Sequence, residues 1–217
     1  MKTNNINYLK IVFLFGTIIS TTSCSDDFLK ENPDTFVSPN TLLVNKEGAE
    51  TYLNGAYDAV QQSVAPTGGS NPAPWSITWG TAATDEVVFP NWGGERKIVY
   101  LHQVTPTTGV INQMWVKLYQ SLNRINSVVD RVGAMTADQI NADDKARFVA
   151  EAKFLRTIVN FALVCTWENV PLMKNEVISL ENANVKQATP QEVYDFMIED
   201  LTSIIPVLPV EQGKGRV

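Results

Sequence analysis

Apolar residues recur every three or four positions over several long stretches of this chain, and this spacing constrains the fold more than any other sequence feature. The clearest stretch has a stripe consisting of Trp115, Leu118, Leu122, Ile125, Val129 and Val132. Such a period places the stripe on one face of an amphipathic helix of about five turns. Gly133 directly follows and is expected to end the helix as its C′ residue.

The same spacing predicts three more helices, over residues 46–63, 144–165 and 190–206. Asn45 can cap the first helix. The last opens with Thr189-Pro190-Gln191-Glu192, which combines an N-cap, a proline at N1 and a glutamate at N3. The helix over 144–165 is apolar over so wide a face that it needs neighbours on two sides. These patterns indicate a mainly α fold, with strands confined to short pieces near residues 86–100.

Residues 64–110 show no sustained period, although they hold three of the five tryptophans, Trp75, Trp79 and Trp92. A long irregular segment inside a compact domain is uncommon unless it is functional, and binding residues are often found on such loops. The run Asn91-Trp92-Gly93-Gly94-Glu95-Arg96 supplies an aromatic ring, an amide, a carboxylate and a guanidinium group. Sugar binding asks for this combination of a stacking face and polar partners.

Charge and residue counts exclude several classes of function. The chain has 17 Lys and Arg against 23 Asp and Glu, a net charge of -6, so it lacks the basic surface that nucleic-acid binding requires. It has one histidine, His102, and two cysteines, Cys24 and Cys165. This inventory excludes zinc ribbons, His-rich metal sites and frameworks of several disulfides, and we expect neither a metal nor a cofactor.

The first 24 residues have the pattern of an export signal. Two lysines precede the apolar run 11–19, which as a helix rises only about 14 Å, too short for a hydrocarbon core of about 30 Å. Small residues then lead to Cys24, which resembles a bacterial lipobox, although Thr21 stands where leucine is usual. We therefore expect residues 1–23 to be a lipoprotein signal peptide and Cys24 to be lipidated. The alternative is an ordinary signal peptide with an incidental cysteine.

The residues after the cysteine suggest where the protein goes. Ser25, Asp26 and Asp27 resemble the signal that exports Bacteroidetes lipoproteins to the outer face of the outer membrane. Residues 24–44 are polar and interrupted by prolines, which is typical of a tether, here an acidic one. The folded domain is expected to occupy residues 45–217.

Five stretches, in order along the chain, resemble the SusD/RagB family of nutrient-binding lipoproteins. They are Cys24-Ser-Asp-Asp-Phe-Leu29; Thr84-Asp-Glu-Val-Val-Phe-Pro90; Trp115 with Tyr119 and Asn126; Ala150-Glu-Ala-Lys-Phe-Leu-Arg156 with Val170-Pro171-Leu172; and Glu192-Val-Tyr194 with Asp200-Leu201 and Leu208-Pro209. The resemblance implies TPR-like helical hairpins that support irregular ligand-binding loops. It also implies capture of oligosaccharides for a SusC-like TonB-dependent transporter in the outer membrane, without catalysis.

The resemblance also assigns candidate ligand-binding residues. Thr84-Asp85-Glu86 resembles the lead-in to the family's ligand loop, so Trp92 is the first candidate for stacking on a sugar. Its polar partners would be Asn91, Glu95 and Arg96, and Trp75 is the second stacking candidate. For each tryptophan the alternative is packing of the loop onto the helices.

Two other functions fit the residues less well. An enzyme could use Asp85 or Glu86 with Glu95 as the acid/base pair of a glycoside hydrolase, but adjacent acids on a loop are usually solvated or cap a helix. A structural or adaptor lipoprotein of the cell envelope would use all its tryptophans in packing. Fluorescence titration with glycans and a reducing-sugar assay would separate the three.

Some motif residues are expected to be structural. Arg156 lies on an otherwise apolar helix and should join two helices, and Asn126 should satisfy a loop carbonyl. The family usually has glycine in the turn after Arg156's helix, where this chain has Glu168-Asn169, so Asn169 is the expected left-handed residue.

The family also continues well beyond this length, so the resemblance predicts an N-terminal portion with a fold truncated at its C-terminus. On that basis the stripe of the last helix is expected to lack part of its partner. The stripe consists of Val193, Met197, Leu201 and Ile204.

Overall fold

The computed structural model describes residues 38–64, 74–82, 84–86, 95–211 and 216. The chain divides into two compact units, Met1–Ser38 and Pro39–Val217, and the description below concerns the second. The folded unit thus begins at Pro39, six residues before the expected start of the domain. Cys24, Ser25, Asp26 and Asp27 lie outside the described residues.

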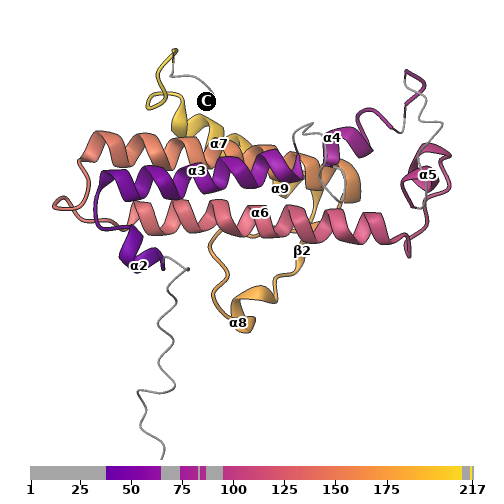
Figure 1. The fold of residues 1–217 in the computed structure, drawn as a ribbon, viewed down its shortest axis with the longest axis horizontal. Helices are drawn as coiled ribbons and strands as arrows, with labels where there is room; N and C mark the ends of the chain where they lie inside the picture. The colour runs from indigo at the N-terminus through magenta and orange to yellow at the C-terminus, as the bar shows by residue number, and fades with distance from the viewer. Residues whose placement is uncertain (1–37, 65–73, 83, 87–94, 212–215, 217) are drawn as a thin grey trace, which may run out of the picture. The chain divides into compact units, whose positions relative to one another are not determined.

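The second unit is mainly helical, as predicted (Figure 1). Its elements are α2 Pro39–Leu42, α3 Lys46–Ser63, α4 Trp75–Thr78, α5 Glu95–Tyr100, α6 Gly109–Gly133, α7 Ala142–Trp167, β1 Val170–Pro171, α8 Leu180–Ala183, β2 Gln187–Ala188 and α9 Pro190–Ile204. The two short strands lie outside residues 86–100, where strand pieces were expected, so that prediction is wrong. They pair antiparallel, with Val170 opposite Ala188, at the two ends of the segment that contains α8.

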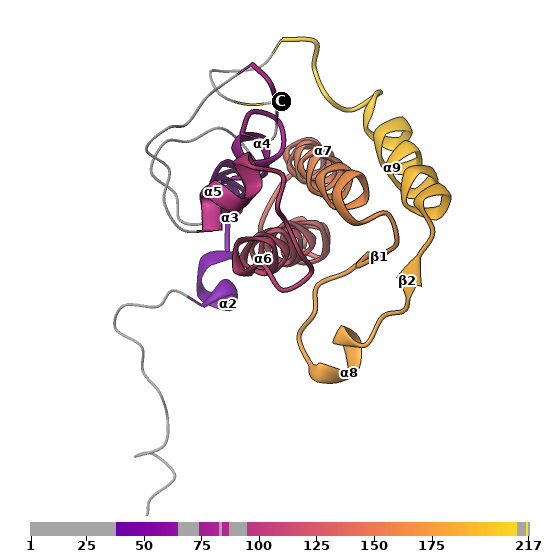
Figure 2. The same ribbon diagram turned by 90° about the vertical axis from the view of Figure 1, so that its right-hand side faces the viewer.

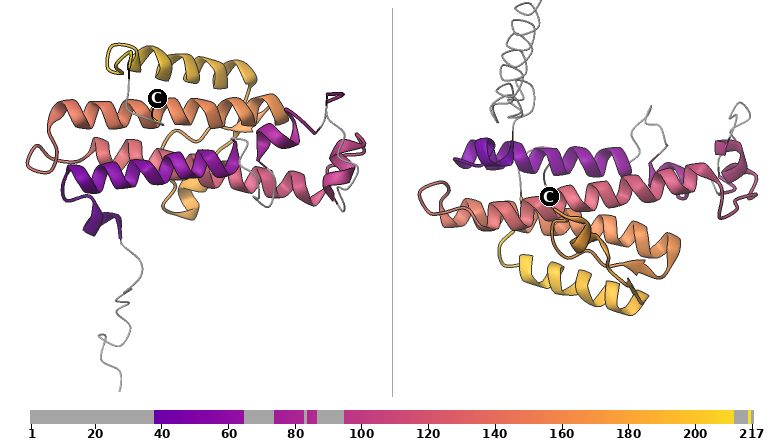
Figure 3. Two further views of the ribbon diagram at one scale, coloured as in Figure 1. Left: turned by 45° about the horizontal axis from the view of Figure 1, so that its top comes forward. Right: turned by 90° about the horizontal axis from the view of Figure 1, so that it is seen from below.

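Helix α7 is the centre of this unit. Helices α3, α6 and α9 all pack against it, and α3 also packs against α6. Figure 2 shows the three helices α3, α6 and α7 nearly end on, with α9 on the far side of α7 from α3, and Figure 3 shows the same order from two other directions. The wide apolar face predicted for the α7 segment is explained by these neighbours.

The predicted stripe of α6 forms the middle of the core. Leu118, Leu122, Ile125 and Val132 are fully buried, and Trp115 and Val129 are partly buried against them. Full burial of such side chains stabilises a fold by about 1.5–3 kcal/mol each. The spacing of three and four therefore identified the residues that hold α6 against α3 and α7.

The predicted helix starts are confirmed by their caps. Asn45 Oδ1 accepts a hydrogen bond from the backbone N–H of Gly48 at 2.9 Å at the start of α3. At the start of α9, Thr189 and Glu192 form a complete capping box. Such side chains satisfy backbone N–H groups that have no partner within the helix.

Three local predictions are wrong. Gly133 is the last residue of α6 rather than its C′ residue, and Ala134 after it is right-handed. Residues 95–100 form helix α5 instead of a strand, because Val99 is buried and α5 packs on α6. In the turn after α7 the positive φ, 63°, belongs to Glu168 rather than to Asn169, so the turn begins one residue earlier than expected.

The prediction for the stripe of α9 is also wrong in part. Val193, Met197 and Ile204 are buried, so most of the stripe has found a partner in α7. Leu201 is exposed, and the buried residue at this level is the acidic neighbour Asp200. The helix is rotated toward Asp200 because this carboxylate has a buried cation to bind on α7.

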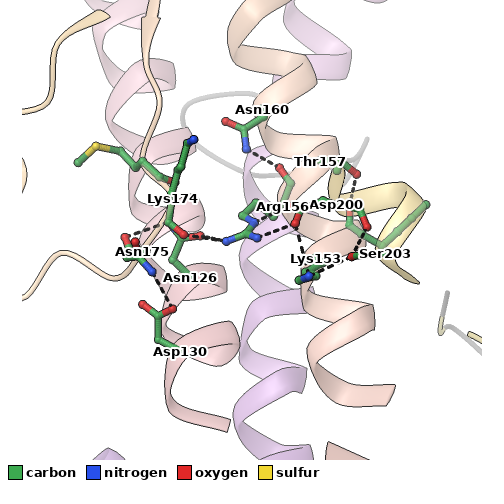
Figure 4. Close-up of polar contacts among 12 residues, drawn as sticks. Asn126, Asp130, Lys153, Arg156, Thr157, Asn160, Lys174, Asn175, Asp200 and Ser203 are labelled. Carbon is green, nitrogen blue, oxygen red and sulfur yellow. Dashed lines mark hydrogen bonds and ion pairs between the residues drawn. The ribbon is translucent and has the colours of Figure 1, made fainter. Parts of the chain in front are cut away.

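That cation is Arg156, and the pair joins α7 to α9 (Figure 4). Arg156 Nε and Nη2 donate to the two carboxylate oxygens of Asp200 at 2.7 and 2.8 Å. Arg156 Nη1 donates to the carbonyl oxygen of Lys174 at 2.8 Å and to Asn126 Oδ1 at 3.2 Å. The predicted role of Arg156 as a contact between helices is confirmed.

Polar residues of α6 hold the segment that follows β1. Asn126 Nδ2 donates to the carbonyl oxygens of Met173 and Asn175 at 2.8 and 3.1 Å, which confirms its predicted role. One turn on, Asp130 Oδ2 accepts from the backbone N–H of Glu176 at 2.7 Å. These hydrogen bonds hold the backbone of the segment along α6, and Leu172 and Met173 also pack against the core.

A second buried carboxylate, Glu151, lies between α7 and α3. The side chain is fully buried and accepts hydrogen bonds from the Tyr57 hydroxyl at 2.8 Å and from Arg216 at 3.0 Å. Arg147, one turn before it on α7, contributes a third contact at 3.3 Å. Buried charges need such pairing because their desolvation is costly.

Candidate functional site

The predicted ligand loop is only partly within the described residues. Asn91 and Trp92 lie outside them. Before the loop, Asp85 and Glu86 are exposed. After it, Glu95 and Arg96 form the first turn of α5, and only their backbone belongs to the described part.

The flanks of the loop nevertheless show where it begins and ends. Helix α5 packs on α6, and both α4 and α5 lie at the end of the unit where α6 begins and α7 finishes (Figure 1). The aromatic side chains described next come from this same end. Helices α4 and α5, which precede and follow the loop that carries Trp92, therefore lie at this end of the unit.

Trp75, the second stacking candidate, is attached to α7. Its indole N–H donates to Thr166 Oγ1 at 2.7 Å, and its ring meets that of Phe161 edge-on, with 6.4 Å between the centroids. The side chain is half-buried against the core. These contacts hold the Trp75 side chain against α7 and so position α4. They favour the packing alternative, and stacking of Trp75 on a sugar stays a prediction.

A second group of rings joins the start of α6 to the end of α7. The Trp115 ring lies 4.7 Å from that of Tyr119 and meets the Trp167 ring edge-on at 5.1 Å. The Tyr119 hydroxyl donates to the carbonyl oxygen of Pro171 at 2.9 Å, and burial raises the pKa of Tyr119. The sequence reading placed Trp115 in a packing stripe and did not single out Trp167. The sequence signal that could have identified Trp167 was its position at the end of a helix, before an irregular turn.

The remaining loop tryptophan behaves as a packing residue. Trp79 lies partly buried against the core, as the sequence suggested. Within the described residues its indole nitrogen is buried without a hydrogen-bond partner, and so is the hydroxyl of Ser76 one turn earlier.

The arrangement offers little for catalysis or metal binding. Asp85 and Glu86 are exposed, whereas a catalytic acid that stays protonated near neutral pH usually has a desolvated carboxyl group. In the described ranges no three His, Cys, Asp or Glu side chains gather as a metal site would require. No helix among the described residues is long and apolar enough to cross a membrane.

The comparisons with known proteins agree with this reading. A model of the SusD-like family, described as starch-binding and associating with the outer membrane, matches residues 27–216. A SusD-like protein of Bacteroides ovatus is 23% identical over 212 residues, which cover 95% of this chain and 36% of the relative. A SusD-like protein of Formosa agariphila is 23% identical and is covered over 40% of its length. The chain thus spans well under half the length of these relatives.

Solved structures show the same fold. A laminarin-binding SusD-like protein is 26% identical with a TM-score of 0.68, over 80% of this chain and 37% of that one. A SusD superfamily protein from Bacteroides vulgatus has a TM-score of 0.70 at 19% identity, over 81% of this chain and 37% of that one. Because the family model matches nearly the whole described chain, this protein belongs to the SusD-like family.

Proposed function

We propose that the protein is a surface lipoprotein that captures oligosaccharides and passes them to a SusC-like TonB-dependent transporter in the outer membrane. Members of the SusD-like family are carbohydrate-binding proteins rather than enzymes. The observation that carries the proposal is the family match over residues 27–216. The loop with Trp92, which lies between α4 and α5 in the sequence, is the proposed place of contact with the sugar.

The chemistry of the loop supports this assignment. Trp92 would stack on the apolar C–H face of a sugar ring, and Asn91, Glu95 and Arg96 would bind its hydroxyls. Trp75 already has its indole N–H bound to Thr166, so its contribution would be to hold α4 and the adjoining loop in place. Because the two tryptophans have different roles, we expect Trp92→Ala to weaken sugar binding directly and a change at Trp75 to act through the position of α4.

The direct test is to titrate the protein with laminarin and with soluble starch and to measure binding by calorimetry. The protein would be a soluble form lacking residues 1–24, all of which precede the compact unit Pro39–Val217. Laminarin is chosen because a similar protein is described as binding it, and starch because the family is described as starch-binding. Trp92→Ala is expected to weaken binding by roughly 1–3 kcal/mol, the usual cost of removing an aromatic anchor, without loss of helix.

Trp79→Phe is the matched control because this residue packs against the core, and it should bind as the unmodified protein does. A reducing-sugar assay on the same samples should detect no turnover. If Trp92→Ala binds normally, the site lies elsewhere. If neither glycan nor any of a panel of other oligosaccharides binds, the adaptor function becomes the better account.

The proposed location has its own test. Cys24→Ala should release the protein from the membrane or leave it unprocessed, because acyl chains supply about 0.8 kcal/mol per buried CH₂. Asp26→Ala with Asp27→Ala should leave the protein anchored but facing the periplasm. Protease treatment of intact cells distinguishes the two faces, and a wild-type protein that resists it would contradict outward exposure.

A further inference from the structure

Arg216 lies against the side of the unit where α3 packs on α7, although it follows α9 in the sequence. Its Nη1 donates to both carboxylate oxygens of Glu151, at 3.0 and 3.3 Å. Its Nη2 donates to Asn54 Oδ1 at 2.9 Å and lies 3.1 Å from Glu50 Oε1. The Arg216 side chain is 15% exposed, so these contacts replace most of the water that would otherwise surround its guanidinium group.

Two aromatic rings complete the surroundings of this guanidinium group. Its Cζ lies 5.8 Å from the ring centroids of both Tyr57 and Phe148, within the distance of about 6 Å at which a cation is attracted to an aromatic face. The Tyr57 hydroxyl also donates to Glu151 Oε2 at 2.8 Å. Tyr57 therefore orients the carboxylate that binds Arg216 and contacts the guanidinium group as well.

The groups around Arg216 come from one face of each of two packed helices. They are Glu50, Asn54 and Tyr57 on α3, and Phe148 and Glu151 on α7. Residues three or four positions apart lie on the same face of a helix. We propose that these five residues form a site specific for a guanidinium group, the arginine site, and that Arg216 is its intramolecular ligand. Arg216 then ties the chain that follows α9 to α3, on the opposite side of α7 (Figure 2).

Arg147 is the other candidate counter-ion for Glu151, and its contact is less well matched. Its Nη1 is 3.3 Å from Glu151 Oε1 and its Nη2 is 3.1 Å from Asp144 Oδ1, so this guanidinium group is divided between two carboxylates. The Arg147 side chain is also 28% exposed, whereas that of Glu151 is fully buried. Because a buried carboxylate without a matched cation is costly, Glu151 depends chiefly on Arg216 for compensation of its charge.

The geometry of the arginine site favours a guanidinium group over an ammonium group. Two different nitrogens of Arg216 bind the Glu151 carboxylate and the Asn54 amide oxygen. A planar guanidinium group reaches both acceptors and lies against aromatic rings, whereas an ammonium group is a single point charge. A small guanidinium compound should therefore fill the arginine site when the Arg216 side chain is removed.

The test is chemical rescue of Arg216→Ala by ethylguanidinium, with ethylammonium at the same millimolar concentration as the matched control. Melting of the soluble form lacking residues 1–24 is followed by circular dichroism. Arg216→Ala should lower the melting temperature, and ethylguanidinium should raise it again with increasing concentration, because a ligand that binds only the folded state stabilises that state. Ethylguanidinium should have little effect on the unmodified protein, whose site is occupied, or on Arg124→Ala, which removes an exposed arginine of α6.

Two further variants test the specificity of the rescue. Glu151→Gln in the Arg216→Ala background should abolish the rescue, because it removes the charge that ethylguanidinium binds. Arg216→Lys keeps a positive charge near Glu151 and so gives the same comparison in a milder variant, which should also melt below the unmodified protein. The proposal is overturned if Arg216→Ala and Arg216→Lys melt like the unmodified protein, if ethylammonium rescues equally well, or if the rescue persists after Glu151→Gln.

Discussion

Replacing Asp200 with alanine tests most directly how α9 is held to α7. Both side chains of the Arg156–Asp200 pair are 5% exposed, and two hydrogen bonds at 2.7 and 2.8 Å join them. Hydrogen bonds to charged groups contribute about 1.5–3 kcal/mol each. Removing one partner of a buried ion pair costs about 3–5 kcal/mol because the other charge is left uncompensated. Asp200→Ala should therefore lower the free energy of unfolding by that amount.

Urea denaturation followed by circular dichroism measures this loss. A typical domain has only about 5–15 kcal/mol of net stability, so the midpoint should fall markedly. Glu199→Ala is the matched control, because its exposed side chain is adjacent on the same helix and such changes usually cost less than about 0.5 kcal/mol. Asp200→Asn, which keeps one acceptor, should fall between the two. Equal stabilities of Asp200→Ala and Glu199→Ala would refute the argument that the ion pair orients α9.

Three further predictions concern single contacts. Asn126→Ala should cost about 1–3 kcal/mol and should speed hydrogen exchange in residues 173–177, because Asn126 binds the carbonyl oxygens of Met173 and Asn175 in this segment. Thr189→Ala removes half of a capping box and should cost about 1 kcal/mol, measured by urea denaturation. The Lys46 ammonium group, 2.8 Å from Asp144 Oδ2, lowers the pKa of Asp144 to about 2. Because the folded pKa is the lower one, this stabilisation is present above about pH 4 and is lost as the pH falls toward 2. Asp144→Asn should flatten the melting temperature over that range.

The helices could be predicted because their signals are local. The stripe of α6 and the caps at Asn45 and Thr189 depend on residues within one or two turns, and the structure confirms them. The start of α6 at Gly109 has no such signal, because Thr108 makes no side-chain cap there. Helix α5 has β-branched residues that favour a strand, and its packing on α6 is not a local signal.

The candidate site depended on contacts that sequence spacing does not contain. Trp75 and Phe161 are 86 positions apart in number, and the hydrogen bond from Trp75 to Thr166 spans 91. No period in the sequence links such residues. Composition identified an aromatic loop as the candidate site, and only the structure shows that the indole N–H of Trp75 is bonded to Thr166.

The polar motif residues show a different relation between sequence and structure. Helix α7 is buried by three neighbours, so an apolar stripe cannot specify which turn of α7 meets which turn of α9. Arg156 does specify which turns of α7 and α9 meet, because a guanidinium group has a fixed fork geometry and the Asp200 carboxylate matches it at one position only. A slip of α9 by one turn would separate the buried guanidinium group of Arg156 from the carboxylate of Asp200, and breaking a buried ion pair costs more than losing any single apolar contact. Arg156, which the sequence predicts to be structural, therefore fixes the register of α7 against α9, and Asn126 fixes the position of the segment after β1 through its carbonyls.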